Sequence, residues 1–332
     1  MDTGKTFTTL DEQKRWFREA QYGMMVHWGL YALLGGEWKG RVMPGIAEWA
    51  QSYFRIPNAE YGRLASAFNP LCFNADEWVQ IARDAGMKYI VFTSKHHDGF
   101  AMFHSKVSPY NVVDATPFKR DVVGELAEAC RRHGLKLGLY YSQDLDWHEP
   151  DGGGYTHADN WGGGQASWTN NWDFTDKSRK DFARYFEGKA KPQIREILTQ
   201  YGEICLIWFD IGFTPTAEQA NGLYDMVRSL QPGCLINSRI GCGKCDYTSS
   251  GDNEITSEDK SAMLYETCAT TNHSWGYKPT DQDWQSADAI RSTREHLARL
   301  GANYLLNVGP DALGRIPARC ADILRAAAPL RS

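Results

Sequence analysis

Residues 74–100, NADEWVQIARDAGMKYIVFTSKHHDGF, carry the pattern that decides the fold. Asn74 is a favoured N-cap, apolar residues then follow at helical spacing, and Gly86 is a typical helix end. Residues 89–92 form a short apolar strand, and polar residues follow from Thr93. The stretch therefore predicts a helix, a buried strand and a polar loop in that order.

This unit recurs along the chain. Helices are expected at 122–133, 177–201, 216–230, 286–299 and 317–328, and strands at 23–28, 135–141, 204–209, 235–238 and 304–308. Apolar strands that alternate with helices predict a parallel sheet. Six to eight such units favour an α/β fold of the (β/α)8 (TIM-like) barrel type over an open doubly wound sheet. Neither GxGxxG nor a Walker A sequence follows a strand, which weakens the nucleotide-binding alternative.

We expect residues 1–332 to form a single catalytic domain. A Gly-rich loop at about 144–176 contains four Trp and two GGG runs, which is too aromatic for a linker. It is predicted to be a lid or wall over the barrel mouth.

The composition excludes several classes of protein. A net charge of −5 gives no electrostatic reason to expect nucleic acid, and no apolar run is long enough to span a membrane. The N-terminus has no secretory pattern, so a cytoplasmic protein is expected. A content of 12 Trp, 16 Tyr, 14 Phe and 31 Gly favours aromatic clefts of the kind found in carbohydrate-active proteins.

The eight cysteines are scattered through the chain. Cys242 and Cys245 form a lone CxxC without a second pair or nearby His. A zinc site is not expected there, and reduced thiols are the simpler interpretation.

Polar residues follow nearly every predicted strand, at the end where barrel active sites lie. Successive residues of a strand face opposite sides, so on a strand at most one of His96 and His97 need face a pocket. Asp210 either caps the next helix or faces the pocket. The apolar Trp208 and Phe209 before it favour the pocket.

Two chemistries fit these residues. Histidines with carboxylates suit a metal-dependent barrel hydrolase, but the first strand has no HxH and the chain has no HExxH. A carboxylate nucleophile with a carboxyl acid/base would instead cleave a glycosidic bond. The aromatic content favours the glycosidase.

Eight segments, in order between about residues 16 and 317, resemble the α-L-fucosidases of glycoside hydrolase family 29. They are GMMVHWGLYA (23–32), AEWA (47–50), YIVFTSKHHDGF (89–100), LGLYYSQDLDW (137–147), LIWFD (206–210), INSRIG (236–241), YETC with SWGY (265–268 and 274–277) and NYLLNVGPDALGRIP (303–317). The resemblance implies a (β/α)8-like catalytic domain and hydrolysis with retained anomeric configuration. Because the chain ends near Ser332, the β-sandwich that many members carry after the barrel is not expected.

The resemblance also implies the site residues. Asp210 of LIWFD matches the family's nucleophile. The positions that match the lining of the fucose pocket are His27, Glu48, Trp49, His96, His97, Tyr141, Trp208 and Arg239. Glu266 matches a Glu that is implied to be structural or sugar-binding.

The acid/base position is open between two residues. In the family it is often the Glu of a GDYxTPExxIP-like run, and here the run is CDYTSSGDNEIT (245–256). Aligning Ile255 with the Ile of that pattern places Asp252 at the Glu, whereas a slip of two residues places Glu254 there, and Glu258 is more distant.

The predicted protein is thus a retaining exo-α-L-fucosidase that acts on fucosylated oligosaccharides without a metal or organic cofactor. Three alternatives remain: an inactive carbohydrate-binding barrel, a hydrolase for a related sugar such as an α-L-galactoside, and a metal-dependent barrel hydrolase.

Overall fold

The computed structural model describes residues 8–157 and 166–329. Eight parallel strands form one sheet in the order β7-β6-β5-β4-β1-β10-β9-β8. The strands are β1 (Tyr22–Val26), β4 (Tyr89–Lys95), β5 (Lys136–Tyr141), β6 (Leu206–Phe209), β7 (Leu235–Ile236), β8 (Thr248–Ser249), β9 (Tyr265–Thr270) and β10 (Asn303–Val308). A parallel bridge between Asn237 and Tyr247 joins the two edge strands, β7 and β8. The sheet therefore curls round into the predicted barrel.

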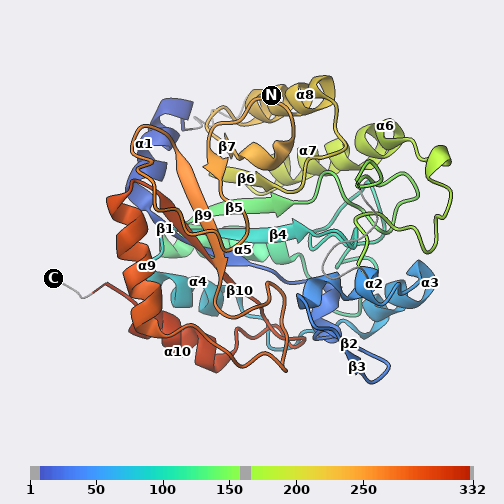
Figure 1. The fold of residues 1–332 in the computed structure, drawn as a ribbon, viewed down its shortest axis with the longest axis horizontal. Helices are drawn as coiled ribbons and strands as arrows, with labels where there is room; N and C mark the ends of the chain where they lie inside the picture. Colours follow the sequence, from blue (N-terminus) through green and yellow to red (C-terminus); the bar gives the residue numbers. More distant parts are fainter. Residues whose placement is uncertain (1–7, 158–165, 330–332) are drawn as a thin grey trace.

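Helices surround this sheet (Figure 1). They are α1 (Leu10–Ala20), α2 (Ala50–Tyr53), α3 (Asn58–Tyr61), α4 (Ala75–Asp84), α5 (Val122–His133), α6 (Phe182–Tyr185), α7 (Lys191–Gln200), α8 (Ala217–Leu230), α9 (Ala287–Arg299) and α10 (Ala318–Ala326). A small hairpin, β2 (Glu37–Trp38) with β3 (Arg41–Val42), lies outside the barrel. None of the described helices is long and apolar enough to cross a bilayer.

Most of the predicted elements are confirmed. The side chain of Asn74 accepts the N–H of Glu77 at 3.2 Å at the start of α4, and Gly86 follows this helix with φ +82°. Strands β1, β4 and β10 are buried along their whole length, as parallel strands covered by helices should be.

Several parts of the fold differ from the prediction. The helix expected at 177–201 begins only at Phe182, and a π-helical turn (Phe186–Ala190) separates α6 from α7. Strand β8 has two residues, too few for an apolar pattern. The connections at 237–247 and 250–264 contain no α-helix, so two of the eight β/α units lack their helix.

Helix α1 was not predicted, and it closes the amino-terminal end of the barrel. Phe17 packs against Tyr89 and Tyr247, with ring centroids 6.1 and 4.9 Å apart. Gln13 Nε2 donates to the carbonyl of Cys205 at 3.1 Å. Because this end is filled, the barrel interior is open at the carboxyl ends of the strands, which point toward α2 and α3 (Figure 1).

Candidate active site

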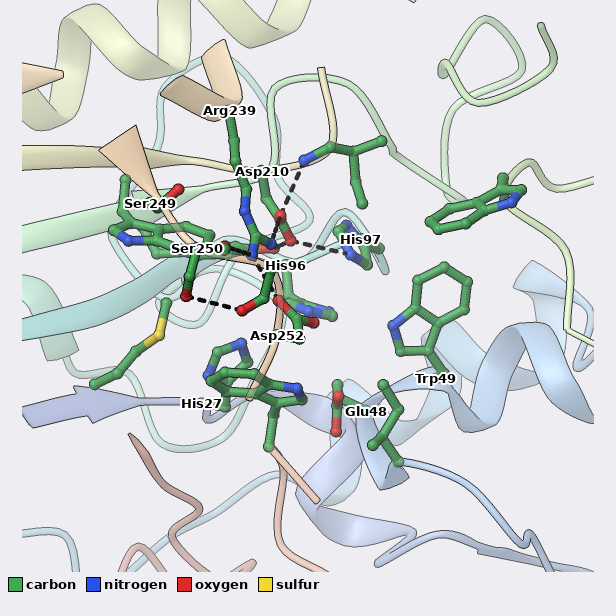
Figure 2. A pocket seen from close by; sticks show the side chains of 18 of the residues that line it. His27, Glu48, Trp49, His96, His97, Asp210, Arg239, Ser249, Ser250 and Asp252 are labelled. Atoms are coloured by element: carbon green, nitrogen blue, oxygen red, sulfur yellow. Dashed lines mark hydrogen bonds and ion pairs between the residues drawn. The ribbon is translucent and has the colours of Figure 1, made fainter. Parts of the chain in front are cut away.

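A pocket of about 440 Å³ opens at the carboxyl ends of the strands. Nine of the twelve predicted site residues line it: His27, Glu48, Trp49, His96, His97, Trp208, Asp210, Arg239 and Asp252 (Figure 2). These residues come from connections far apart in the sequence. The barrel therefore brings together the residues that the resemblance singled out.

Asp210 lies directly after β6 and is held at both carboxylate oxygens. Arg239 donates to Oδ1 at 2.9 Å, as does the backbone N–H of Ile211, and the Tyr140 hydroxyl donates to Oδ2 at 2.8 Å. Burial alone would raise the pKa of Asp210, but the charge and hydrogen bond of Arg239, together with the hydrogen bond from Tyr140, lower it below its ordinary value. Asp210 is therefore a fixed, ionised carboxylate at neutral pH, not a helix cap.

Arg239 links two carboxyl groups. Its second terminal nitrogen donates to Asp252 Oδ1 at 2.6 Å and to the carbonyl of Ser250 at 2.7 Å. The guanidinium also lies over the Trp208 ring, 4.6 Å from its centroid. Asp210 and Asp252 thus share one guanidinium, which places the two carboxyl groups close together.

Asp252 and Glu254 have different surroundings. Asp252 lines the pocket with a side chain that is 49% exposed. Partial burial raises its pKa, the charge of Asp210 adds to that effect, and Arg239 opposes it. Glu254 is exposed and does not line the pocket; its carboxyl group folds back against Gly251. Only Asp252 of this pair lies beside Asp210.

Both His96 and His97 line the pocket, as the resemblance implied, although strand alternation required only one of them to face it. Strand β4 ends at Lys95, and the two histidines follow in a turn where the alternation of a strand no longer applies. Asp98 and Gly99 shape this turn: Gly99 has φ +76°, and Asp98 Oδ1 accepts the N–H of Phe100 at 3.2 Å.

The pocket histidines are neutral hydrogen-bonding groups. Burial lowers the pKa of His27 to about 4 and that of His97 to about 3. Asn307 Nδ2 donates to a backbone carbonyl, so its Oδ1 accepts from His27 Nδ1 at 2.7 Å. Nε2 of His27 is then an acceptor. In the same way, Ser142 Oγ donates to a carbonyl and accepts from His97 Nδ1 at 2.7 Å.

Glu48 is a buried carboxyl group in the pocket wall. One oxygen accepts the backbone N–H of Gly276 at 2.8 Å, which joins the AEWA and SWGY segments. Burial raises the pKa of Glu48 to about 7, although that hydrogen bond opposes the change.

Three predicted residues lie outside the pocket lining. Tyr141 points away from the barrel interior, and its hydroxyl donates to Gln193 at 2.8 Å. Tyr140, its neighbour, lines the pocket instead, because adjacent strand residues face opposite sides. Glu266 lies below the pocket and accepts from Trp208 Nε1 at 3.0 Å and from the Tyr89 hydroxyl at 2.7 Å. Glu254 is the third, as described above.

The aromatic loop contributes Trp168 to the wall of the pocket. Trp168 lines the pocket and contacts Trp49 edge to face at 5.3 Å, while Trp147 packs behind Trp49 at 5.0 Å. Trp161 of this loop lies outside the described residues. The remaining lining residues were not predicted: Met25, Ile46, Tyr140, Ile211, Phe213, Ser249, Ser250, Gly251 and Trp275. Of these, Met25, Tyr140 and Trp275 lay in segments that carry the resemblance, and Ser249, Ser250 and Gly251 lay in the run that contains the acid/base candidates.

Among the described residues, no group of three or more His, Cys, Asp or Glu side chains is arranged to hold a metal ion. All eight cysteines, each within the described ranges, are free thiols. The barrel holds two acidic side chains on one guanidinium, surrounded by aromatic rings and neutral histidines. This arrangement is typical of barrel glycoside hydrolases.

Within that class, the profile of the alpha-L-fucosidase family matches residues 3–329, and the chain belongs to this family. The chain is 29% identical to the tissue alpha-L-fucosidase of Bos taurus over 91% of its own length and 27% identical to the alpha-L-fucosidase of Dictyostelium discoideum over 93%. It spans 63% of the bovine protein and 68% of the Dictyostelium protein.

Solved structures agree with this assignment. The alpha-L-fucosidase AlfC from Lactobacillus casei is 54% identical, with a TM-score of 0.91, and the match covers 95% of this chain and 97% of AlfC. AlfC has been solved with the product α-L-fucose and, as a point mutant, with 4-nitrophenyl-α-L-fucopyranoside. The enzyme from Vibrio sp. strain EJY3 is 34% identical with a TM-score of 0.84, over 96% of this chain and 55% of that one.

Proposed function

We propose that this protein is a retaining exo-α-L-fucosidase that hydrolyses terminal α-L-fucosyl residues of oligosaccharides or glycoconjugates. The observation that carries the proposal is the shared guanidinium of Arg239, with Asp210 at 2.9 Å and Asp252 at 2.6 Å. A nucleophile and an acid/base of a retaining glycosidase lie ~5–5.5 Å apart, and two carboxyl groups on one guanidinium suit that separation.

In the first step, the Asp210 carboxylate attacks the anomeric carbon of fucose. Asp252 gives its proton to the glycosidic oxygen as the bond to that oxygen breaks, so the leaving sugar departs as an alcohol. The raised pKa of Asp252 favours the protonated form that this step needs. Asp210, with its lowered pKa, is the anion that faces the positive charge developing on the sugar ring.

In the second step, Asp252, now a carboxylate, takes a proton from water. The hydroxide attacks the anomeric carbon, the ester bond to Asp210 breaks, and fucose leaves with its original configuration. The proton on Asp252 and the charge on Asp210 are then restored. Both steps therefore use the same two side chains.

The pocket walls suit fucose in particular. Nε2 of His27 is an acceptor for a ring hydroxyl, and the buried Glu48 offers oxygens to others. Trp208 and Trp275 supply apolar ring surface for the C6 methyl group. An α-L-galactoside would place a hydroxyl against this surface without a partner, which disfavours it.

The test is release of 4-nitrophenol from 4-nitrophenyl α-L-fucoside, beside the matching α-L-galactoside, with and without a chelator. We expect turnover of the fucoside that the chelator does not reduce, and none by the Asp210→Ala variant. Faster turnover of the galactoside would reassign the substrate. Binding of fucose without turnover would support a binding-only barrel, and loss of activity with the chelator would support a metal-dependent hydrolase.

A further inference from the structure

The pocket residues form two zones that differ in exposure. The inner aromatic rings are buried, with Trp208 2% and Trp275 6% exposed. At the mouth, Phe213 is 42% exposed and Trp168 is half-buried, yet both line the same cavity. The cavity therefore continues outward from its buried inner part along an apolar edge.

This edge is rigidly built. The Phe213 and Trp168 rings meet edge to face at 5.4 Å, and His157 stacks flat on Phe213 at 3.8 Å with an interplanar angle of 3°. The buried Asp144 accepts the backbone N–H groups of Phe213 at 2.6 Å and of Thr214 at 3.0 Å. The half-exposed Phe213 ring is thus held by His157 and Trp168, and its backbone is held by Asp144.

Ile211, between the nucleophile and Phe213, gives a second and independent observation. Its φ is +69°, a left-handed conformation that a β-branched residue rarely adopts and that Gly or Asn would adopt with less strain. Its N–H donates to Asp210 Oδ1 at 2.9 Å, and its side chain lines the cavity. The N–H contact needs only the backbone, so it does not explain why a strained isoleucine stands here.

We propose that Ile211, Phe213 and Trp168 form the subsite for the leaving group, a platform that binds a pyranose through its apolar C–H face or an aryl group through its ring. This inference rests on the proposed fucosidase activity and adds the part of the substrate beyond fucose. None of the three side chains is charged, so the platform selects for a flat apolar face. Asp252, on the other side of Arg239, protonates the oxygen that joins the two sugars.

The test compares two substrates whose leaving groups differ in reach. α-L-Fucosyl fluoride has a leaving group of one atom that cannot contact the platform, whereas a fucosyl-N-acetylglucosamine disaccharide has a full pyranose. The measured quantity is the ratio of kcat/KM for the disaccharide to that for the fluoride. We expect Phe213→Ala to lower this ratio about tenfold, with Trp168→Ala as a second variant that changes it in the same direction.

Leu313→Ala is the matched control, because Leu313 is also 42% exposed but does not line the pocket. It should leave the ratio unchanged. An unchanged ratio in both Phe213→Ala and Trp168→Ala would overturn the platform, and so would an equal loss in the control. Failure of the proposed function looks different, since the unaltered protein would then cleave neither substrate. Turnover of the fluoride by each variant shows that its inner site is folded.

Discussion

Glu266→Gln tests how the buried carboxyl group of Glu266, below the pocket, affects the stability of the protein at different pH values. Glu266 is fully buried, and this burial raises its pKa from 4.5 to about 7. Between these pH values the folded protein keeps a proton that the unfolded chain has lost. Stability from this group is therefore present at low pH and is lost as pH rises through about 7.

The size of the effect follows from the shift. At about 1.4 kcal/mol per pKa unit, a rise from 4.5 to about 7 corresponds to about 3.5 kcal/mol. Gln has nearly the shape of a protonated Glu and cannot ionise. The free energy of unfolding of the variant minus that of the unaltered protein should thus rise by about 3 kcal/mol between about pH 5 and about pH 8.

The assay is denaturant unfolding of both proteins at several pH values, followed by tryptophan fluorescence. Other buried groups, such as Glu48 and His27, titrate in the same range, but they are common to both proteins and cancel in the difference. Glu266→Leu is the counterpart variant. It leaves the Trp208 and Tyr89 donors unpaired, which should cost about 1–3 kcal/mol for each donor at every pH. A Gln difference that stays constant from low to high pH would refute the reasoning.

Three further predictions concern the charged groups. In steady-state kinetics, Asp252→Ala should slow hydrolysis of a disaccharide about 100-fold more than hydrolysis of an activated aryl fucoside. Glu254→Ala should slow hydrolysis of neither substrate. The reverse pattern would make Glu254 the acid/base. Arg239→Gln removes the charge that lowers the pKa of Asp210, so the acid limb of the pH profile of kcat/KM should move to higher pH. An acid limb that does not move would contradict the role of Arg239 in keeping Asp210 ionised. Asp146→Asn should lower the free energy of unfolding, measured by denaturant, by about 3–5 kcal/mol. Asp146 lies 3.0 Å from both Lys95 and Lys189, and all three side chains are buried. Near-native stability of this variant would show that the ion pairs contribute little.

The barrel was predictable because its long strands are apolar on both faces. Strand β4 stands out between Gly86 and the polar turn after it, and its burial is complete. Helix α1 escaped prediction since its apolar face is narrow, although Thr9 and Glu12 form a capping box that marks its start. Short β8 has no periodicity to detect, because its two residues are positioned by contacts with distant parts of the chain.

The site was predictable wherever a residue ends a strand. Asp210 and His27 follow directly from that rule. Tyr140 and Tyr141 differ by one position, and only the register of β5 decides which of them faces the barrel interior. Phe213 lies in a connection with no repeating pattern. Its position depends on Asp144, nearly seventy residues away, which no local pattern reveals.

Arg239 and Asp252 both lie on the connections that lack an α-helix. A helix packed on the sheet fixes the length of the loop that leads to it, but these two segments carry no such anchor. Insertions or deletions in 253–263, after Asp252 and before the buried Leu264, would disturb little of the hydrophobic core, since loop-closure entropy changes slowly with length. This side of the barrel mouth is therefore where directed evolution has most freedom to alter which glycans enter, with β4, β5 and the nucleophile left untouched.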